Sequence, residues 1–578
     1  MFGHLIKYSE AYLEKLPENL LDLIKDIPKA ELIATIVAIN SKINPVNSSY
    51  IDDSRKTQIE CIRILFLDTK NHLTHSNCLF FIENYLRTPK NNILFSRVTC
   101  LYALQEILSI DDFSLSAPEY TIENREYIFK FLLAVNERIL LFDKEYLSAG
   151  YEELGDRFYE YFMFKELPHN QYYHSLNSIN FLHKSYSFLK TLENDEDFGN
   201  HFKKYLAQTF HVSSLLDFFK FIMYTYFKSF DEKLQLNYIN IMKTEVSTVK
   251  ILDAFSKVND FEKPDINDLK IFEFLNIKKS PLFKGFDEIH KDLITYLILD
   301  NKIFLEKTYS LFINDFWFDY LKPNQICNRT DWGNFVGNNF FEPFIEEIFK
   351  EAFKNNKKIV FKCTDELKLK IDGRTEVEYA DYYIRQNNKI ILAEAKSNYL
   401  PVINGYKTVK TKDDFDKIDF DKFYKDYGLT QLAKKTIKYF HQYKFFLNDN
   451  FFDFNKKVEL FPTLIVNDVI FSSGSASMAF KKKFEKMLED EKIEMDNDVQ
   501  KINPLTIINV SDLQNIQNSL KYKKQNIFNI FRHYHSISSL EAIARTGNTS
   551  LGLLTVEHSI NKLIKDNLVA NKKLDWLK

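Results

Sequence analysis

The stretch that most constrains the fold of this chain is residues 376–396, EVEYADYYIRQNNKIILAEAK. Two β-prone runs flank Asn387-Asn388, and asparagine tolerates the left-handed backbone conformations that tight hairpin turns need. If these two asparagines form the loop, the register of the hairpin places Asp381 directly opposite Glu394.

This register predicts two carboxylates and an amine on one face of the hairpin. Side chains alternate along a strand, so Lys396 projects on the same face as Glu394. Directly opposed Cβ atoms lie about 4.5–5.5 Å apart, which is close enough for two carboxylates to share a cation. Two like charges facing each other destabilise a strand pair, and a divalent cation would remove that cost. The stretch therefore indicates a metal-binding hairpin.

The size and composition of the chain indicate a multidomain globular protein. With 578 residues it is expected to fold into two to four domains. Phenylalanine and tyrosine are abundant (54 and 32), whereas glycine and proline are scarce (13 each), which favours long helices over a loop-rich β protein. The formal net charge of −3 excludes a global basic field, so any nucleic-acid binding must come from a local patch.

The cysteines and the apolar segments bear on the cellular compartment. Five scattered cysteines do not form a disulfide framework, and the first residues lack a secretory pattern, so we expect a cytoplasmic protein. The most apolar window, Leu215–Phe227, is short and contains Asp217 and Lys220. We therefore expect a buried helix there, and no membrane partner.

The hydrophobic pattern predicts three domains. Residues 1–325 are expected to form a large all-α N-terminal domain, with a sub-boundary in the polar, proline-punctuated stretch 259–282 and helix again over 293–321. Residues 326–515 are expected to form a mixed α/β domain. Residues 516–578 read as a helical C-terminal segment, either a winged helix–turn–helix or a plain helical cap.

The middle domain has a definite expected order of elements. Around the hairpin we expect a helix at 340–353, a strand at 358–363, a polar crossing at 397–425, a helix at 427–446, a strand at 458–466 continuing through 469–471, a helix at 478–489 and a strand at 505–510. The order α-β-β-β-α-β implies a mixed sheet with helices packed on it.

Residues 334–510 resemble the PD-(D/E)XK, or restriction-endonuclease-like, nuclease superfamily. The signature of that family is an acid on the second strand and (D/E)-x-K on the third strand, and the matching positions are Asp381 and Glu394-Ala395-Lys396. The family's first helix often carries a glutamate after a glycine and an aromatic residue, as in GNNFFE ending at Glu342. Many members place a glutamine on the helix after the third strand, which corresponds to Gln431.

Two departures from the family pattern affect this assignment. Ala380 precedes Asp381, where the name of the motif calls for proline. Pro343 follows Glu342 directly and limits how far a helix can extend upstream, so Glu346, one turn later, stays an alternative to Glu342.

The resemblance implies a metal-dependent phosphodiesterase. The carboxylates of Asp381, Glu394 and Glu342, with the Ala395 carbonyl, would hold Mg²⁺ or, alternatively, Mn²⁺. Lys396 would orient or help to deprotonate the attacking water and stabilise developing charge. The resemblance gives Gln431 the role of positioning water or backbone.

Lysines around the crossing are the candidates for nucleic-acid contacts. Amines that neutralise phosphates, with tyrosine rings interleaved, suit a nucleic-acid groove. The candidates are Lys407, Lys410, Lys434, Lys435 and Lys438. Aspartates are interspersed among them, so a solvated charged loop is an equal alternative.

The resulting expectation is an endonuclease that acts on DNA in preference to RNA, with a role in bacterial defence against phage or plasmid DNA by analogy to the superfamily. The N-terminal domain is expected to serve a protein partner or self-assembly. No phosphate-binding Gly-Lys-Ser/Thr loop is present, so ATP-driven translocation is not expected. The rival hypotheses are a catalytically degenerate scaffold or nucleic-acid-binding protein, and an RNase.

Overall fold

The computed structural model shows two compact units, and each is described by itself. Unit 1 comprises residues 1–149 and 172–327, and unit 2 comprises residues 150–171 and 328–578. The structure describes residues 4–45, 51–66, 76–87, 92–109, 120–147, 157–161, 163–164, 177–228, 230–231, 236–256, 274–286, 292–371, 375–397, 415–437, 449, 452, 456–538, 556 and 559–560. Within these residues, none of the helices combines the length and apolar character needed to cross a bilayer.

Unit 1 is mainly helical, as its periodic apolar residues predict. Its helices and short helical turns are α1 (Tyr8–Tyr12), η1 (Leu20–Leu23), α2 (Lys29–Ile43), α3 (Arg55–Phe66), α4 (Ser76–Arg87), α5 (Arg97–Leu108), α6 (Ile122–Leu147), α8 (Ser178–Glu193), α9 (Gly199–Thr209), α10 (Leu215–Lys228), α11 (Val246–Ala254), α12 (Leu275–Lys279), α13 (Asn301–Glu306), α14 (Ser310–Asp315) and η5 (Phe316–Leu321). The window expected to be a buried helix is α10, which is buried on one side only: Phe218, Phe219 and Ile222 are fully buried, whereas Leu216, Tyr224 and Phe227 are exposed.

The expectation of an all-α N-terminal domain is wrong. Unit 1 contains an antiparallel sheet, β3 (Phe230–Asp231), β4 (Leu236–Met242), β6 (Leu293–Ile298) and β5 (Leu282–Phe286), in that spatial order. A further two-stranded parallel pair joins β1 (His4–Leu5) to β2 (Asn92–Ile93). The run Leu-Ile-Thr-Tyr-Leu-Ile at β6 is short and continuously apolar, and such a run does not distinguish a strand from a buried helix by its periodicity.

The second segment of unit 2, from residue 328, begins with a continuous helical rod. The rod consists of α15 (Arg329–Asn334), the π-helix η6 (Phe335–Phe341) and α16 (Glu342–Phe353). The α-helix α16 begins at Glu342, directly before Pro343, as expected, but helical backbone continues upstream of it as η6. Proline lacks an N–H and its ring crowds the preceding turn of an α-helix. The wider π turn lies directly before Pro343, where the missing hydrogen bond and the crowding by the ring would arise. Turns of π-helix occur often at functional sites.

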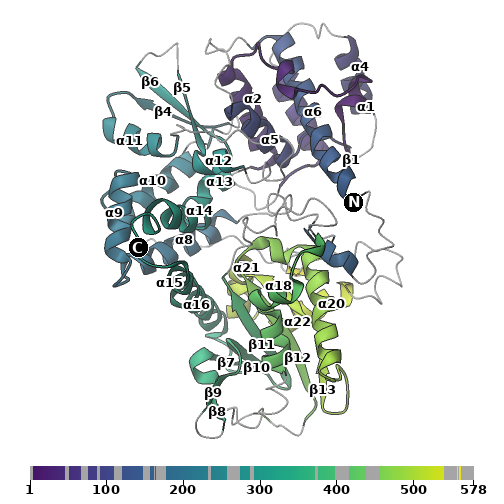
Figure 1. Ribbon diagram of the computed structural model, residues 1–578, viewed down its shortest axis with the longest axis vertical. Helices are drawn as coiled ribbons and strands as arrows, with labels where there is room; N and C mark the ends of the chain where they lie inside the picture. The colour runs from purple at the N-terminus through teal and green to yellow at the C-terminus, as the bar shows by residue number, and fades with distance from the viewer. Residues whose placement is uncertain are drawn as a thin grey trace. The chain divides into compact units, whose positions relative to one another are not determined.

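The sheet of unit 2 is mixed, as expected. Its strands are β7 (Val360–Cys363), β10 (Tyr382–Gln386), β11 (Lys389–Lys396), β12 (Val458–Val466), β13 (Gln500–Ile502) and β14 (Thr506–Asn509). The spatial order is β7-β10-β11-β12, and β13 and β14 both pair with the far side of β12 (Figure 1). Strand β10 is antiparallel to both neighbours, whereas β11, β12, β13 and β14 are parallel.

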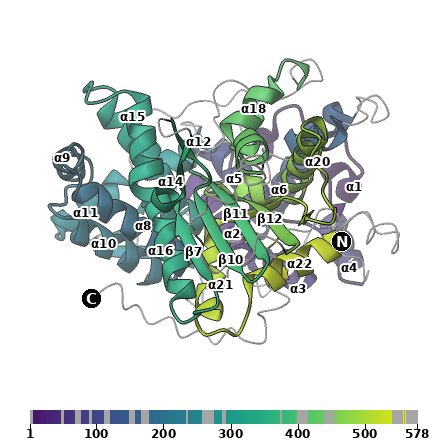
Figure 2. The same cartoon turned by 90° about the horizontal axis from the view of Figure 1, so that it is seen from below.

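Helices cover both faces of this sheet (Figure 2). Phe349 of α16 packs on Tyr382, and α22 (Ile527–Ser538) places Phe528 against Phe461, so these helices lie on one face; α21 (Val510–Lys521) packs against α16. On the other face lie α18 (Phe420–Asp426), the π-helix η8 (Gln431–Ile437) and α20 (Gly474–Asp490). The observed class is therefore α plus α/β, with a three-layered unit 2.

Several boundaries within unit 2 differ from the expected ones. The stretch expected to be strand at 469–471 is instead the 3₁₀ turn η10 (Val469–Ser472), because Asp468 caps it by accepting from the Ile470 N–H. Helix α18 falls inside the expected polar crossing, and residues 398–414 and 438–448 lie outside the described part. The winged-helix hypothesis concerns residues that lie largely outside it as well.

The central hairpin has the predicted register. Gln386 pairs with Lys389 and Tyr382 pairs with Ala393, and Asn387 takes a left-handed φ of 55° in the two-residue loop. The ladder stops at Tyr382, however. Upstream of it, β9 (Thr375–Glu378) pairs with β8 (Lys368–Ile371), after the 3₁₀ turn η7 (Thr364–Leu367), in a separate small hairpin that the sequence analysis did not anticipate.

A segment that the sequence analysis assigned to the N-terminal domain packs within unit 2. Tyr161 and Phe164 are buried against Phe415, and Phe164 also contacts Phe420 and Phe423. We call residues 157–164 the strap. The chain enters unit 2 at residue 150, returns to unit 1 at residue 172 and re-enters unit 2 at residue 328.

Candidate active site

Strand β11 carries the first two site residues on the face that η8 covers. Glu394 is 1% exposed, and its Oε2 atom lies 3.6 Å from Nζ of Lys396. Lys396 also donates to Oε1 of Gln431, the first residue of η8, at 3.2 Å. The alternation of side chains along the strand therefore produces the acid–amine pair that the sequence predicts, and η8 brings Gln431 to the same amine.

Asp381 lies in the bend just before β10, and not in the ladder opposite Glu394 as the simple register predicts. Its carboxylate accepts a hydrogen bond from the Ala395 N–H at 2.6 Å and is 3% exposed. The side chain of Asp381 thus bonds to β11 just past the last paired residue of β10. Asp381, Glu394 and Lys396 come together, but through a side-chain-to-backbone bond in place of a directly opposed pair.

The rod supplies Glu342. Its carboxyl group is half-buried, and the charges of Asp381 and Lys396 shift its pKa. Tyr382 ties this part of the rod to the sheet, because its hydroxyl donates to the Glu342 carbonyl at 2.7 Å. Upstream on the rod, a Cβ at Gly337 would lie only 3.2 Å from Oγ of Ser397, so glycine permits the close approach of η6 to the end of β11.

The structure separates Glu342 from its alternative. Glu346 forms an ion pair with Lys350 on its own helix and hydrogen-bonds to Cys363. Lys396 interacts electrostatically with Glu394, Asp381, Glu342 and Glu378. Glu342 is therefore the helix acid that belongs with the hairpin residues.

Glu378 is a site residue that the sequence analysis missed. It is the last residue of β9, it hydrogen-bonds to Asp381, and its charge reaches Glu342 and Lys396. The only sequence signal was its position three residues before Asp381, at the point where the chain leaves the small hairpin.

The carboxyl groups of the site hold protons more tightly than free carboxyls do. Burial raises the pKa of Asp381 to about 6, with Lys396 and the Ala395 N–H opposing and Glu378 adding to the rise. Burial, reinforced by Asp381 and Glu378 and opposed by Lys396, raises the pKa of Glu342 to about 7. Burial alone would lower the pKa of Lys396, but the surrounding carboxylates outweigh it and the pKa is raised.

No family model, curated protein or solved structure matches the chain. The interpretation of the site therefore depends on its own geometry and chemistry.

The donor set of the site fits a hard divalent cation. Among the described residues, no group of three or more His, Cys, Asp or Glu side chains is arranged to hold a metal ion. Mg²⁺ does not require three such side chains, because it usually binds through one or two carboxylates and keeps several waters. Asp381 and Glu394 are buried carboxylates of this kind, and burial raises the pKa of Asp381 to about 6.

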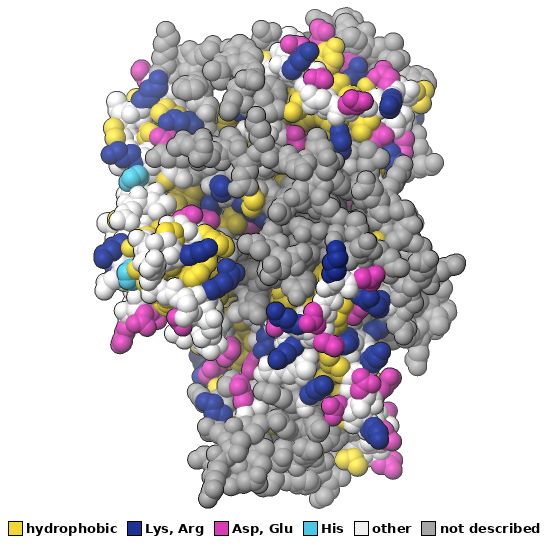
Figure 3. Space-filling model, in the orientation of Figure 1, with side chains coloured by type: hydrophobic (Ala, Val, Ile, Leu, Met, Phe, Trp, Pro, Cys, Tyr) yellow, Lys and Arg dark blue, Asp and Glu magenta, His cyan; other side chains and the backbone are white. Residues whose placement is uncertain are grey.

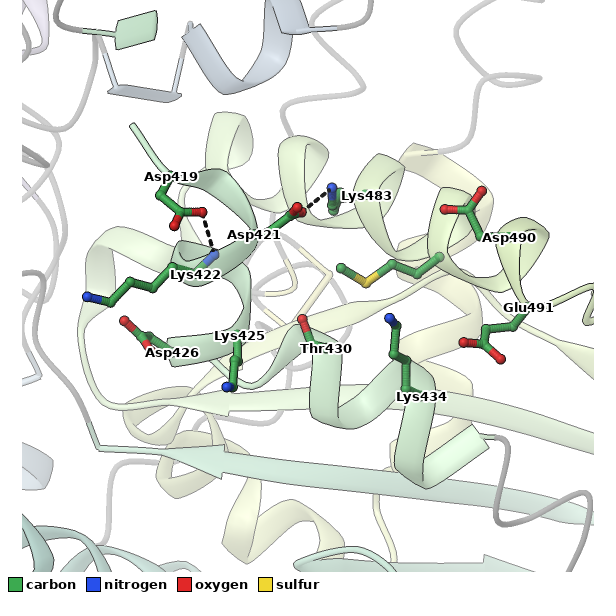
Figure 4. A pocket seen from close by; sticks show the side chains of 11 residues that line it. Asp419, Asp421, Lys422, Lys425, Asp426, Thr430, Lys434, Lys483, Asp490 and Glu491 are labelled. Carbon is green, nitrogen blue, oxygen red and sulfur yellow. Dashed lines mark hydrogen bonds and ion pairs between the residues drawn. The ribbon is translucent and has the colours of Figure 1, made fainter. Parts of the chain in front are cut away.

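A hollow of about 760 Å³ lies between α18, η8 and α20 (Figure 4). Thr430 and Lys434 line it from the η8 side, so it adjoins the helical turn that carries Gln431. The carboxylates of the site do not line it. Its wall carries four lysines and five acids, namely Lys422, Lys425, Lys434, Lys483, Asp419, Asp421, Asp426, Asp490 and Glu491.

The lysines proposed for nucleic-acid contacts are only partly described. Lys434 is exposed on η8 and faces the hollow. Lys435 lies on η8 with its side chain undescribed, and Lys407, Lys410 and Lys438 lie outside the described residues. Positive and negative side chains are intermixed on the visible surface around α18 and α20 (Figure 3). The structure therefore leaves open both the binding-loop and the solvated-loop interpretations.

Proposed function

We propose that this chain is a divalent-metal-dependent nuclease that hydrolyses phosphodiester bonds of DNA, with its active site in unit 2. The observation that carries the proposal is the convergence of Asp381, Glu394, Lys396, Glu342 and Gln431 at the end of β11. The α-β-β-β-α-β order of unit 2 and the resemblance to PD-(D/E)XK nucleases support it. The mixed charge around the hollow gives it no support.

The proposed metal ligands are the carboxylates of Asp381 and Glu394 and the carbonyl of Ala395, and Glu342 is either a further ligand or, when it does not bind the cation, the general base. A bound Mg²⁺ or Mn²⁺ supplies charge neutralisation at the phosphoryl oxygens and lowers the pKa of a water molecule.

Lys396 contributes a positive charge on an amine whose position is fixed by its neighbours. The raised pKa of its amine keeps it protonated at neutral pH, which suits stabilisation of the charge that develops on the phosphate. This protonation state argues against Lys396 as the group that removes a proton from water. Gln431 and Glu394 hold the amine from two sides, so it is oriented before substrate binds.

Glu342 suits the part of general base. An effective base has a pKa near the working pH, and the pKa of Glu342 lies at about 7. Its half-buried carboxyl leaves it accessible to a water molecule. In this assignment Glu342 accepts the proton of the attacking water, and Lys396 stabilises the phosphoryl oxygens.

A cleavage assay tests the proposal. Full-length protein is incubated with Mg²⁺ or Mn²⁺ and duplex DNA, single-stranded DNA or RNA in parallel. We expect metal-dependent cleavage of DNA, with a loss of about 10²–10³-fold in kcat for Lys396→Ala. The matched control is Lys389→Ala, which removes a lysine from the other end of β11 and should leave cleavage unchanged.

Two results would contradict the proposal. One is no cleavage by the wild-type chain at high enzyme concentration with either metal. The other is equal cleavage by the wild type and Lys396→Ala, which would point to a contaminating nuclease. Cleavage of RNA alone would support the proposed active site but show that the substrate is RNA and not DNA. Metal-independent DNA binding without cleavage would favour the degenerate-scaffold alternative.

A further inference from the structure

The turn between α18 and η8 contains a glycine in direct contact with the site lysine. Gly428 is buried and has a φ of +77°, in the left-handed region. Its N–H donates to the Lys425 carbonyl at 3.1 Å, and its carbonyl accepts from the Leu432 N–H at 2.9 Å. Gly428 thus lies in the turn between the end of α18 at Asp426 and the start of η8 at Gln431.

The side chain of Lys396 lies against the α-carbon of Gly428. A Cβ built at this position would lie 3.1 Å from Cγ and 3.2 Å from Cδ of Lys396, and it would overlap Cε. The three methylenes of the lysine therefore occupy the space that any other residue at 428 would fill. At its end, the amine reaches Gln431, three residues after the glycine, and Glu394 on its own strand.

We propose that Gly428 is a positioning residue for Lys396: the missing Cβ forms a slot that fixes the lysine stem and so holds the amine between Gln431 and Glu394. A lysine stem has many rotamers, and ordering it costs entropy that the slot removes before substrate arrives. The contact between Gly428 and the stem of Lys396 does not depend on any activity. The consequence of this contact for catalysis rests on the proposed nuclease function.

Two requirements act on position 428, and they can be separated. The left-handed φ disfavours most residues but is tolerated by asparagine. Any residue with a Cβ at this position, asparagine included, would force the stem of Lys396 to shift. A structural role in the turn alone predicts that Gly428→Asn is nearly harmless, whereas a positioning role predicts that it is not.

A thermodynamic cycle tests the slot without reference to cleavage. The melting temperatures of the wild type, Gly428→Ala, Lys396→Ala and the double variant are compared. Lys396→Ala removes the atoms that a Cβ at 428 would overlap. Gly428→Ala is expected to lower the melting temperature by about 2–4 °C more in the wild-type background than in the Lys396→Ala background. Equal losses in the two backgrounds would overturn the inference.

A kinetic measurement tests the consequence for the site. A displacement of about 1 Å in a catalytic group can cost about 10²-fold in rate, so Gly428→Asn is expected to lower kcat by that order with little change in KM. The control is Gly333→Ala on α15, where a Cβ would meet no atom within 4 Å, and it should leave kcat unchanged without lowering the melting temperature. Full activity of Gly428→Asn would overturn the positioning role.

The two measurements distinguish the inference from the proposed function. If the wild-type chain does not cleave nucleic acid, the melting cycle still decides whether Gly428 forms the slot for Lys396. If the chain cleaves but the cycle shows no coupling, the proposed function stands and the positioning role of Gly428 falls.

Discussion

At the residue scale, the site depends on carboxyl groups that are costly to ionise. The pKa of Asp381 is raised to about 6 and that of Glu342 to about 7, with burial as the first cause in both. Carboxyl groups in the unfolded chain have pKa values of about 4. Between that pH and the pKa values of the folded state, the folded protein therefore keeps protons at these two groups that the unfolded chain has lost. Their contribution to stability is complete below pH ~4 and is lost as the pH rises through 6 and 7.

This proton affinity predicts how Mg²⁺ should stabilise the fold. Protons compete with the cation for the same carboxylates, so the rise in melting temperature produced by saturating Mg²⁺ is expected to be small at pH 5 and to grow up to pH 8. Thermal denaturation with and without Mg²⁺ across that range measures it.

The control for this prediction is Glu346→Gln, which neutralises the helix acid that pairs with Lys350 and should retain the full pH dependence. Asp381→Asn should remove most of it. A stabilisation by Mg²⁺ that is the same at every pH, or unaffected by Asp381→Asn, would contradict the assignment of the cation to these groups.

Some site residues could be predicted from the sequence because their relations are local. Asp381, Glu394 and Lys396 belong to one hairpin, whose register follows from a two-residue loop and the alternation of side chains. Glu378 and Gly428 could not be found in this way. Glu378 belongs to a different small hairpin, and Gly428 meets Lys396 only after the chain has crossed to the η8 face.

At the scale of elements, a buried ion pair joins Arg385 of β10 to Asp449, which lies 64 positions later in the chain. The guanidinium of Arg385 contacts the Asp449 carboxylate at 2.5 Å and 2.7 Å, and the Tyr383 hydroxyl donates to the same carboxylate at 3.1 Å. Arg385 and Asp449 are both almost fully buried. Burial of a paired charge favours specificity of packing more than net stability.

Breaking this pair should be far more costly than replacing it. Asp449→Ala leaves the Arg385 charge buried without its carboxylate, and we expect a loss of about 3–5 kcal/mol in the free energy of unfolding. The double replacement Arg385→Met with Asp449→Leu should lose much less, because no uncompensated charge is left behind. Urea denaturation compares the variants, and equal losses for the single and double changes would refute this account of the ion pair.

The elements of unit 2 follow from sequence better than those of unit 1. Strands β11 and β12 are long apolar runs bounded by turn residues, and their type is clear. Strand β6 is equally apolar but only six residues long, and nothing local separates it from a helix. Pairing with β4 and β5, which are distant in sequence, settles its conformation.

At the scale of the whole molecule, the chain passes between the two units three times. The strap lies in the segment between the first and second of these passages, and it packs on α18, the helix that precedes Gly428. Arg157 lies over the Phe415 and Phe420 rings at 4.4 Å and 4.8 Å, and the Tyr424 hydroxyl donates to Glu160 at 2.8 Å. These partners lie some 260 positions apart in sequence, so no local pattern could have predicted the contact.

The strap should contribute strongly to the stability of unit 2. Phe164 is fully buried among three phenylalanines, and Phe164→Ala is expected to cost about 3–5 kcal/mol. Phe158→Ala, at a half-buried position of the same strap, should cost clearly less. Differential scanning calorimetry of both variants measures the difference, and equal small losses would show that the strap is not part of the unit's core.

The central claim is that Asp381 and Glu394 hold a divalent cation. Anomalous diffraction from crystals of the full chain grown with Mn²⁺ tests it most directly, with Asp381→Asn as the comparison. We predict an anomalous peak in contact with both carboxylates in the wild type and its loss in Asp381→Asn. A wild-type map at saturating Mn²⁺ with no peak between Asp381 and Glu394 would contradict the account.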